Sequence, residues 1–288
     1  MTRSKTITGG ILAGPAIMYM TLFFAAPAVI LFIYSFWISV FYKTVPDFVF
    51  TNYIASITSP VFLKLTWNAI FIGVVTASIT LAVSIPFGYY LVYVSKSQMI
   101  LYLVLITWFS SYLVRIYAWR TLLGTNGVIN TVLMKIGVIS APIDAFLFNS
   151  FAVILTLTHI YLPFCILLVV ASFSEIKSEL LDASRDLGTS NLGAFFQVIA
   201  PNASNGLLGA FMLTFILVAG DFVTPQMLGG SSGQTTGLLI ADQFRKTGNW
   251  PLGAAQAVIM FIISLLIYQV LLFTGRFLGL IPKRGFRK

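Results

Sequence analysis

Residues 182–201 read DASRDLGTSNLGAFFQVIAP and form a polar stretch, rich in small residues, in a chain that is otherwise almost continuously apolar. A hydrocarbon core of about 30 Å needs roughly 20 apolar residues for one helical span. The apolar runs on both sides of the stretch reach that length. The stretch therefore separates two predicted membrane spans, and it is the part of the chain best suited to contact a soluble partner.

The composition indicates an integral membrane protein. Of 288 residues, 58% are hydrophobic and 9% are charged, whereas soluble domains carry about 25% charged residues. Backbone polar groups inside hydrocarbon must be paired within the protein, so long apolar spans form α-helices. The sequence therefore predicts an all-α integral membrane protein with six transmembrane helices.

We predict one transmembrane domain over residues 1–288, with a cytoplasmic loop at 175–201 between the fourth and fifth spans. The first apolar run starts like a secretory signal, but it continues to Trp37. That length exceeds the about 7–15 apolar residues of a signal peptide, so we interpret the run as a retained span. The predicted spans cover 11–37, 66–94, 99–121, 150–173, 203–224 and 253–281.

The net charge of +9 is best explained by topology rather than by a nucleic-acid partner, because many basic residues gather at the chain ends. Cytoplasmic segments of membrane proteins carry an excess of lysine and arginine. An even number of spans agrees with placing both termini in the cytoplasm. The basic residues at the ends are Arg3, Lys5, Lys283, Arg284, Arg287 and Lys288.

The sequence argues against an enzyme. His159 is the only histidine and Cys165 the only cysteine, and no motif supplies a nucleophile with a base or a set of metal ligands. We interpret His159 as an interhelical hydrogen-bonding residue. The glycine-rich run 229–236 lacks the lysine of a phosphate-binding loop, so any ATP is expected on another subunit.

Two features near the outer side of the membrane have alternative interpretations. Asp221 near the end of the fifth span is either a structural cap or ion pair, or a substrate contact, because charged residues in spans are costly and commonly functional. Aromatic residues beside Arg115 and Arg120 form either an interfacial belt or the mouth of a pathway. These aromatic residues are Trp108, Tyr112, Tyr117 and Trp119.

The polar stretch predicts a helix–turn–helix on the cytoplasmic face. Apolar or small residues recur at helical spacing, Gly188 suits a left-handed helix end, and Pro201 is expected to break the chain before the fifth span. One of residues 189–191 is expected to cap the second helix. The residues at helical spacing are Ile176, Leu180, Ala183 and Leu187.

At this stretch the chain resembles binding-protein-dependent ABC importer permeases of type I. Their EAA loop has the pattern E-A-A, three residues, G, nine residues, I-x-L-P, and here Asp182, Ala183, Gly188 and Pro201 occupy matching positions. The departures are Asp182 for Glu, Ser184 for Ala, Val198 for Ile and Ala200 for Leu. Residues 111–119, 221–230 and 249–255 resemble the first permease subunits of spermidine/putrescine importers.

The resemblance implies a subunit in the bacterial inner membrane that pairs with a homologous permease, either a different chain or a second copy. It further implies two ATPase subunits, which bind ATP and magnesium, and an external solute-binding protein, with no cofactor in this chain. The implied coupling residues are Asp182, Ala183, Ser184, Arg185, Gly188 and Pro201.

For cargo we expect a polyamine or a similar organic cation. Asp221 would attract an ammonium group, and Trp108, Tyr117 or Trp119 would add cation–π contacts. The alternatives are the same permease role for an amino-acid-like compound or a metal ion, a secondary transporter that works without ATP, and a membrane scaffold. Inverted repeats or more ionisable residues in the spans would favour a secondary transporter.

Replacing Asp221 by Asn is expected to impair uptake more than assembly, since the change removes the charge and keeps the shape. Uptake of labelled amines and recovery of the assembled complex measure the two effects. Unchanged transport kinetics would contradict a substrate contact at this position.

Overall fold

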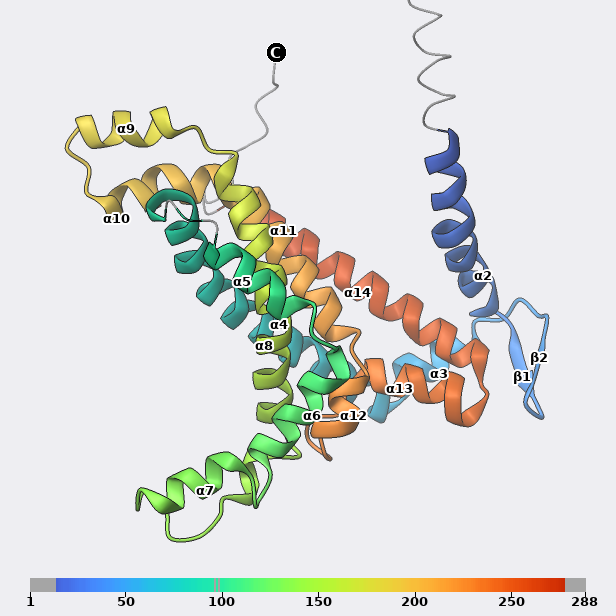
Figure 1. Ribbon diagram of the computed structural model, residues 1–288. Coiled ribbons are helices and arrows are strands. Elements are labelled where there is room, and N and C mark those ends of the chain that lie inside the picture. Colours follow the sequence, from blue (N-terminus) through green and yellow to red (C-terminus); the bar gives the residue numbers. More distant parts are fainter. Residues whose placement is uncertain (1–13, 96, 98, 278–288) are drawn as a thin grey trace, which may run out of the picture. The chain divides into compact units, whose positions relative to one another are not determined.

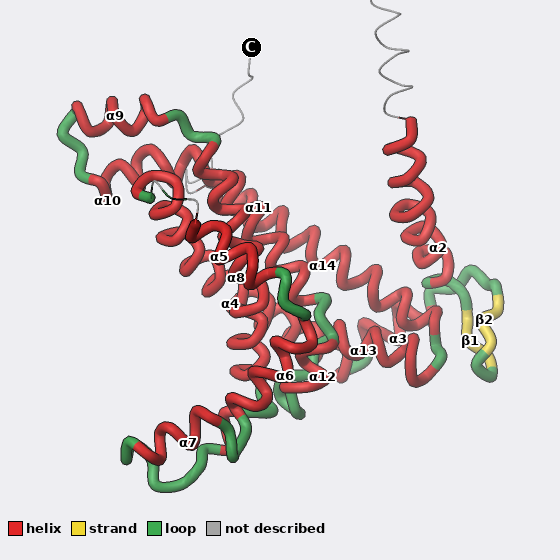
Figure 2. The backbone as a smooth tube through the Cα atoms, viewed as in Figure 1, coloured by secondary structure: helices red, strands yellow, loops and turns green. Residues whose placement is uncertain are grey.

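The computed structural model describes residues 14–95, 97 and 99–277. These residues are mostly helical (Figures 1 and 2). They form two compact units. One unit comprises the described residues up to Leu63 together with Leu239–Ile262, and the other comprises Lys64–Leu238 with the described residues from Ile263 onward. The basic residues at both chain ends, on which the predicted orientation rests, lie outside the described residues.

The first unit starts with the helix Gly14–Tyr34, which contains the π-helical turn η1 (Thr21–Ala25) and ends as α2 (Ala26–Tyr34). A short antiparallel hairpin of β1 (Ile38–Val40) and β2 (Lys43–Val45) follows outside the predicted spans, and the predicted helical fold class is confirmed. Asn52 ties the next helix to the chain leaving α2 by donating to the Ser35 and Trp37 carbonyls, at 3.1 and 2.7 Å. The remaining elements are α3 (Thr51–Thr58), the end of α13 (Thr236–Asp242), η5 (Gln243–Thr247) and the start of α14 (Trp250–Phe277).

The second unit is a helical bundle. Its long helices are α4 (Pro60–Tyr89), which continues as the π-helical turn η2 (Tyr90–Val94), α8 (Ser150–Ser174) and α11 (Ala200–Ala219). The shorter elements are α5 (Met99–Trp108), α6 (Tyr112–Leu123), α7 (Val128–Lys135), η3 (Asp144–Phe146), α9 (Ser178–Asp186), α10 (Asn191–Ala194), η4 (Phe195–Ile199) and α12 (Val223–Leu228).

Close helix contacts hold this bundle together. Two buried clusters run along α8, one around Leu157 with residues of α4, α6, α11 and α12, the other around Phe173 with α9, η4 and α11. Small residues allow the helices to approach: a Cβ on Gly88 would lie 2.6 Å from Val169 Cγ1, and one on Gly206 would collide with Ser172. Because lipid tails are as apolar as leucine, such close packing is a main source of helix association in membranes.

Among the described residues, five helices are long and apolar enough to cross a membrane, or six if a bent pair counts as one span. The bent pair replaces the predicted continuous third span: Met99–Trp108 and Tyr112–Lys135 meet at 88°. Hydroxyl groups before the break compete for backbone carbonyls, because Thr107 donates to Val104 O at 2.6 Å and Ser110 donates to Thr107 O at 2.9 Å.

The predicted break at Pro201 is wrong. The helix runs without interruption from Asn191 to Ala219, so it starts earlier and ends earlier than the predicted span 203–224. The wider turn η4 precedes Pro201 and places the proline near the start of α11, where its missing N–H is tolerated. The Asn202 side chain donates to Val198 O at 2.7 Å and satisfies a carbonyl in this turn.

Gly206→Ala is expected to destabilise the bundle by about 1–3 kcal/mol, because the new methyl group would collide with Ser172 on the facing helix. Gly209→Ala is the matched control: it lies one turn further along the same helix, and its Cβ would meet nothing within 4 Å. Thermal unfolding of the purified protein in detergent compares the two. Equal melting temperatures for both variants would contradict close packing at Gly206.

Candidate functional site

The polar stretch forms two helices joined by a tight turn, as the sequence predicts. Helix α9 carries Asp182, Ala183, Ser184 and Arg185, and Gly188 follows its end with φ +81°. The Gly188 N–H donates to Arg185 O at 2.8 Å and the Thr189 N–H donates to Ser184 O at 3.1 Å. This bond pair is a Schellman motif, which satisfies the last carbonyls of a helix.

The second helix starts immediately after this turn. Ser190 is its N-cap, with the side-chain oxygen accepting from the Gly193 N–H at 3.2 Å. Since this helix continues to Ala219, the polar stretch is connected to the membrane helix without a flexible joint. The capped turn after α9 therefore leads directly into a continuous helix of the bundle.

The buried face of α9 differs from the predicted one. Leu181 and Ser184 are 5% and 9% exposed and pack toward the bundle, whereas Leu180 and Leu187 are 47% and 87% exposed. Leu181 belongs to the buried cluster around Phe173. The spacing in the sequence identified a helix, but the apolar residues at that spacing are divided between the bundle and the surface.

The exposed face of α9 combines apolar and charged groups. Ala183 is exposed beside Leu180 and Leu187, and Asp182 and Arg185 form a solvent-exposed ion pair at 3.4 Å. Exposed pairs of this kind contribute little to stability. The face is therefore available to a protein partner, and Figure 1 shows α9 and α10 at the end of the bundle opposite α7.

Asp221 is a buried helix cap. Its side chain is largely shielded, at 9% exposed, and its two carboxylate oxygens accept from the Val223 and Thr224 N–H groups, at 3.1 and 3.3 Å. These N–H groups belong to the first turn of α12, where a negative charge is stabilised by the helix dipole. The geometry therefore realises the structural alternative raised by the sequence.

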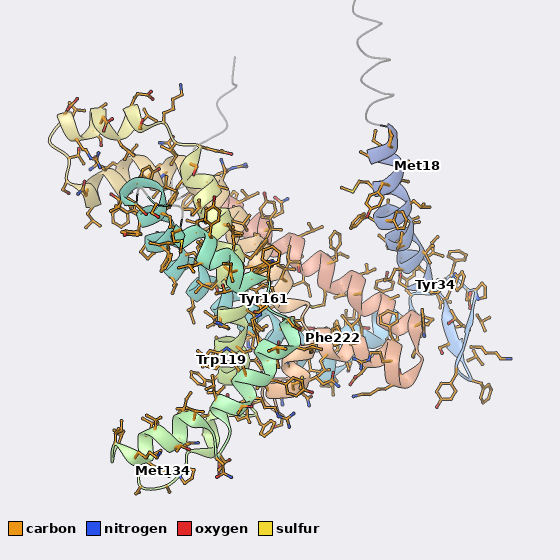
Figure 3. All side chains as sticks on the ribbon, viewed as in Figure 1. Met18, Tyr34, Trp119, Met134, Tyr161 and Phe222 are labelled. Carbon is orange, nitrogen blue, oxygen red and sulfur yellow. The ribbon has the colours of Figure 1, made fainter. Side chains whose placement is uncertain are left out.

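Two tyrosines lie next to this carboxylate, and the sequence pattern identified neither as its partner. The Tyr112 hydroxyl lies 2.9 Å from Thr224 Oγ1 and is close enough to interact with the Asp221 charge. Tyr161 on α8 is close enough to interact with the Asp221 charge. Figure 3 shows Tyr161 and Phe222, the neighbour of Asp221, in the same part of the bundle. A polar, aromatic residue inside an apolar span is the signal that could have identified Tyr161.

The predicted aromatic contacts do not gather around Asp221. Trp108 at the end of α5 stacks on Phe164 with the ring centres 5.5 Å apart, Trp119 on α6 donates to His159 Nδ1 at 3.1 Å, and Tyr117 is 54% exposed. The bond from Trp119 confirms the interhelical role predicted for His159. Trp108, Tyr117 and Trp119 therefore occupy three separate environments along the broken span.

Arg115 connects the broken span to the proline-containing part of α8. Its guanidinium lies 5.9 Å from the centre of the Trp108 ring, and its Nη1 donates to Ile160 O at 3.1 Å. Ile160 lies three residues before Pro163, in the turn where the proline removes a backbone donor. Arg115 thus links α6 to α5 and α8.

Comparison with solved structures identifies a known protein with the same fold. The fold matches a bacterial alginate ABC transporter, solved in complex with an alginate pentasaccharide-bound periplasmic protein, with a TM-score of 0.74 and 14% identity over 96% of both chains. This match defines the fold as that of an ABC importer transmembrane subunit. A comparison with models of protein families matches none of them.

Sequence relatives give the family. The chain is 30% identical to the spermidine/putrescine transport system permease protein PotB of Haemophilus influenzae, over 75% of this chain and 76% of the relative. It is 31% identical to the inner membrane ABC transporter permease protein YdcU of Escherichia coli, over 67% of this chain and 64% of the relative. The chain therefore belongs to the family of ABC transporter permeases that includes the PotB proteins.

Gly188→Ala is expected to cost about 1–2 kcal/mol, because a residue with a Cβ is strained at φ +81° although no atom lies within 4 Å of the new methyl group. Gly188→Asn is the control, since Asn adopts left-handed conformations more readily than Ala. Transport-coupled ATP hydrolysis by the assembled complex should fall for the alanine variant and remain near wild type for the asparagine variant. Equal activities of the two variants would contradict a role for the turn conformation.

Proposed function

We propose that this permease forms half of the pathway of an ATP-driven polyamine importer, and that α9 is the helix through which ATPase subunits move it. The observation that carries the proposal is the division of α9 into two faces. Leu181 and Ser184 attach the helix to the bundle, while Leu180, Ala183 and Leu187 remain exposed. A helix that contributes only to stability would have little need for leucines on its outer side.

The proposed mechanism is a rigid-body transfer of motion. Closure of two ATPase subunits around ATP and magnesium would displace α9. The Schellman turn at Gly188 and the capped, continuous helix Asn191–Ala219 would carry the displacement into the bundle. Asp182 and Arg185 would orient the ATPase subunit on α9, and Pro201 would be part of the helix that moves. This chain would transmit the displacement, while the ATPase subunits would bind ATP and magnesium.

The proposed assembly places the chain in a bacterial inner membrane with both termini in the cytoplasm. A homologous permease would supply the other half of the pathway, and a periplasmic binding protein would deliver the cargo. The name of the YdcU relative and the complex of the alginate transporter with a periplasmic protein support this arrangement. The C-terminal end of α8, which precedes α9, would then face the cytoplasm. Its N-terminal end, which follows α7, would face the periplasm.

The proposed cargo is spermidine, putrescine or a similar organic cation, supported by the similarity to PotB proteins. In the described structure the Asp221 carboxylate already accepts two backbone N–H groups and lies close to Tyr112. We therefore propose that Asp221 shapes the pathway by holding α12 and provides a negative potential for the cation. The aromatic faces of Trp108, Tyr117 and Trp119 remain the candidates for cation–π contact.

Leu187→Asp tests the docking role. The side chain is 87% exposed, so we expect an unchanged melting temperature of the permease and at least a tenfold loss of bound ATPase and of ATP-driven uptake. Val132→Asp on α7, 48% exposed at the opposite end of α8, is the matched control and should retain ATPase binding. Undiminished import by the Leu187 variant would contradict the proposal.

Uptake into proteoliposomes that contain the assembled wild-type complex and the cognate binding protein tests the identity of the cargo separately from the coupling role of α9. Uptake of labelled spermidine should be reduced by excess putrescine and unaffected by excess amino acid or divalent metal. ATP-dependent uptake of another solute would retain the permease role and replace the cargo. Uptake that continues without ATP would favour a secondary transporter.

A further inference from the structure

The hairpin after the first membrane helix ends in an unusual turn. Val40 pairs with Lys43, so Phe41 and Tyr42 alone form the loop between β1 and β2. Both have positive φ angles, +48° and +63°. Two-residue hairpin turns of this kind favour Asn-Gly or Gly-Gly, because residues with bulky side chains are disfavoured at positive φ.

Packing among the described residues leaves both side chains of this turn exposed. Phe41 is 92% exposed and Tyr42 is 83% exposed. Residues in sparsely populated backbone conformations persist when something in their surroundings stabilises them, and they gather at sites with a function. The exposed aromatic tip therefore indicates a stabilising contact outside this chain.

The ends of two candidate membrane helices fix the position of the tip. The strand β1 starts four residues after the helix Gly14–Tyr34, which is long and apolar enough to cross a membrane and whose most apolar window has no buried residue. Tyr42 also lies close to the segment that precedes α14. A Cβ added to Gly248 would lie 3.4 Å from Tyr42 Cδ1, and α14 starts two residues later at Trp250. Figure 3 shows Tyr34 at the end of α2, next to the hairpin.

The length of the hairpin keeps the tip near the membrane surface. A strand rises about 3.3 Å per residue, so strands of three residues extend about 10 Å. The polar headgroup region is about 5–7 Å thick on each side of the hydrocarbon core. The tip of a hairpin that starts at the end of a span therefore lies no more than about 5 Å from this region, within reach of an aromatic side chain.

The chemistry of the tip fits a lipid surface. Aromatic residues are enriched where hydrocarbon meets headgroups, because they combine an apolar ring with, in tyrosine, a polar end. Lys43 follows directly and provides a charge for lipid phosphates. We propose that the Phe41–Tyr42 tip inserts into the phospholipid headgroup layer and anchors the hairpin to the membrane surface.

Fluorescence quenching in lipid nanodiscs tests this anchor in the assembled complex. A fluorophore is attached to Phe41→Cys in a Cys165→Ser background, and quenching is measured with phospholipids that carry a nitroxide on the headgroup. A label at Ser232→Cys in the exposed glycine-rich loop is the aqueous control, and one at Val29→Cys on α2 is the control for hydrocarbon. We expect at least threefold stronger headgroup quenching at position 41 than at position 232.

Quenching at position 41 equal to that at position 232 would overturn the proposal. A second result would also overturn it: no lipid quenching at position 41, together with protection of the label from aqueous iodide when the binding protein is added. The tip would then be a contact for that protein.

A second variant tests whether the aromatic side chains provide the anchor. Phe41→Asn with Tyr42→Gly preserves the hairpin, because Asn-Gly is favoured in this turn. The fluorophore is then placed at Lys43→Cys, with and without the double substitution. We expect the double substitution to lower headgroup quenching at least twofold, and unchanged quenching would contradict the anchor.

Discussion

The structure depends on one constraint: a backbone polar group in hydrocarbon must find a partner in the protein. Three polar side chains in and around the helices form such bonds to the backbone. Asn202 donates to the Val198 carbonyl before Pro201, Arg115 donates to Ile160 O in the turn that Pro163 disturbs, and Asp221 accepts from the first N–H groups of α12. The polar residues in and around the spans are therefore explained first by the backbone they satisfy.

The same constraint explains why α9 suits a coupling role. The helix is stopped by a glycine turn whose bonds satisfy its last carbonyls, and the following helix starts at Ser190 and runs into the bundle. A rigid connection of this kind preserves the direction of a displacement, whereas an unpaired loop would absorb it. The mixed face of α9, with exposed leucines beside an exposed ion pair, is the surface that we propose as the contact for the ATPase subunits.

The region around Asp221 is held by polar contacts between short helices and a long one. Asp221 accepts from the first N–H groups of α12, Tyr112 on α6 lies 2.9 Å from Thr224 on α12, and Arg115 on α6 donates to Ile160 on α8. A substitution at Asp221 would therefore disturb the local structure as well as remove a charge, so both effects must be separated when its proposed role in transport is tested.

The sequence by itself determined the membrane location, the helical class, the approximate positions of the long helices, the glycine-stopped turn at Gly188 and the similarity to importer permeases. These properties depend on local composition, on spacing along one helix and on motif residues that are neighbours in the chain. Only the tertiary structure decided which side of α9 is buried, that the third span bends after Trp108, that Pro201 lies within a helix and that Asp221 meets Tyr112 and Tyr161. The reason is physical: these outcomes depend on partners from distant parts of the chain, such as Phe164 for Trp108, which spacing in one segment does not specify.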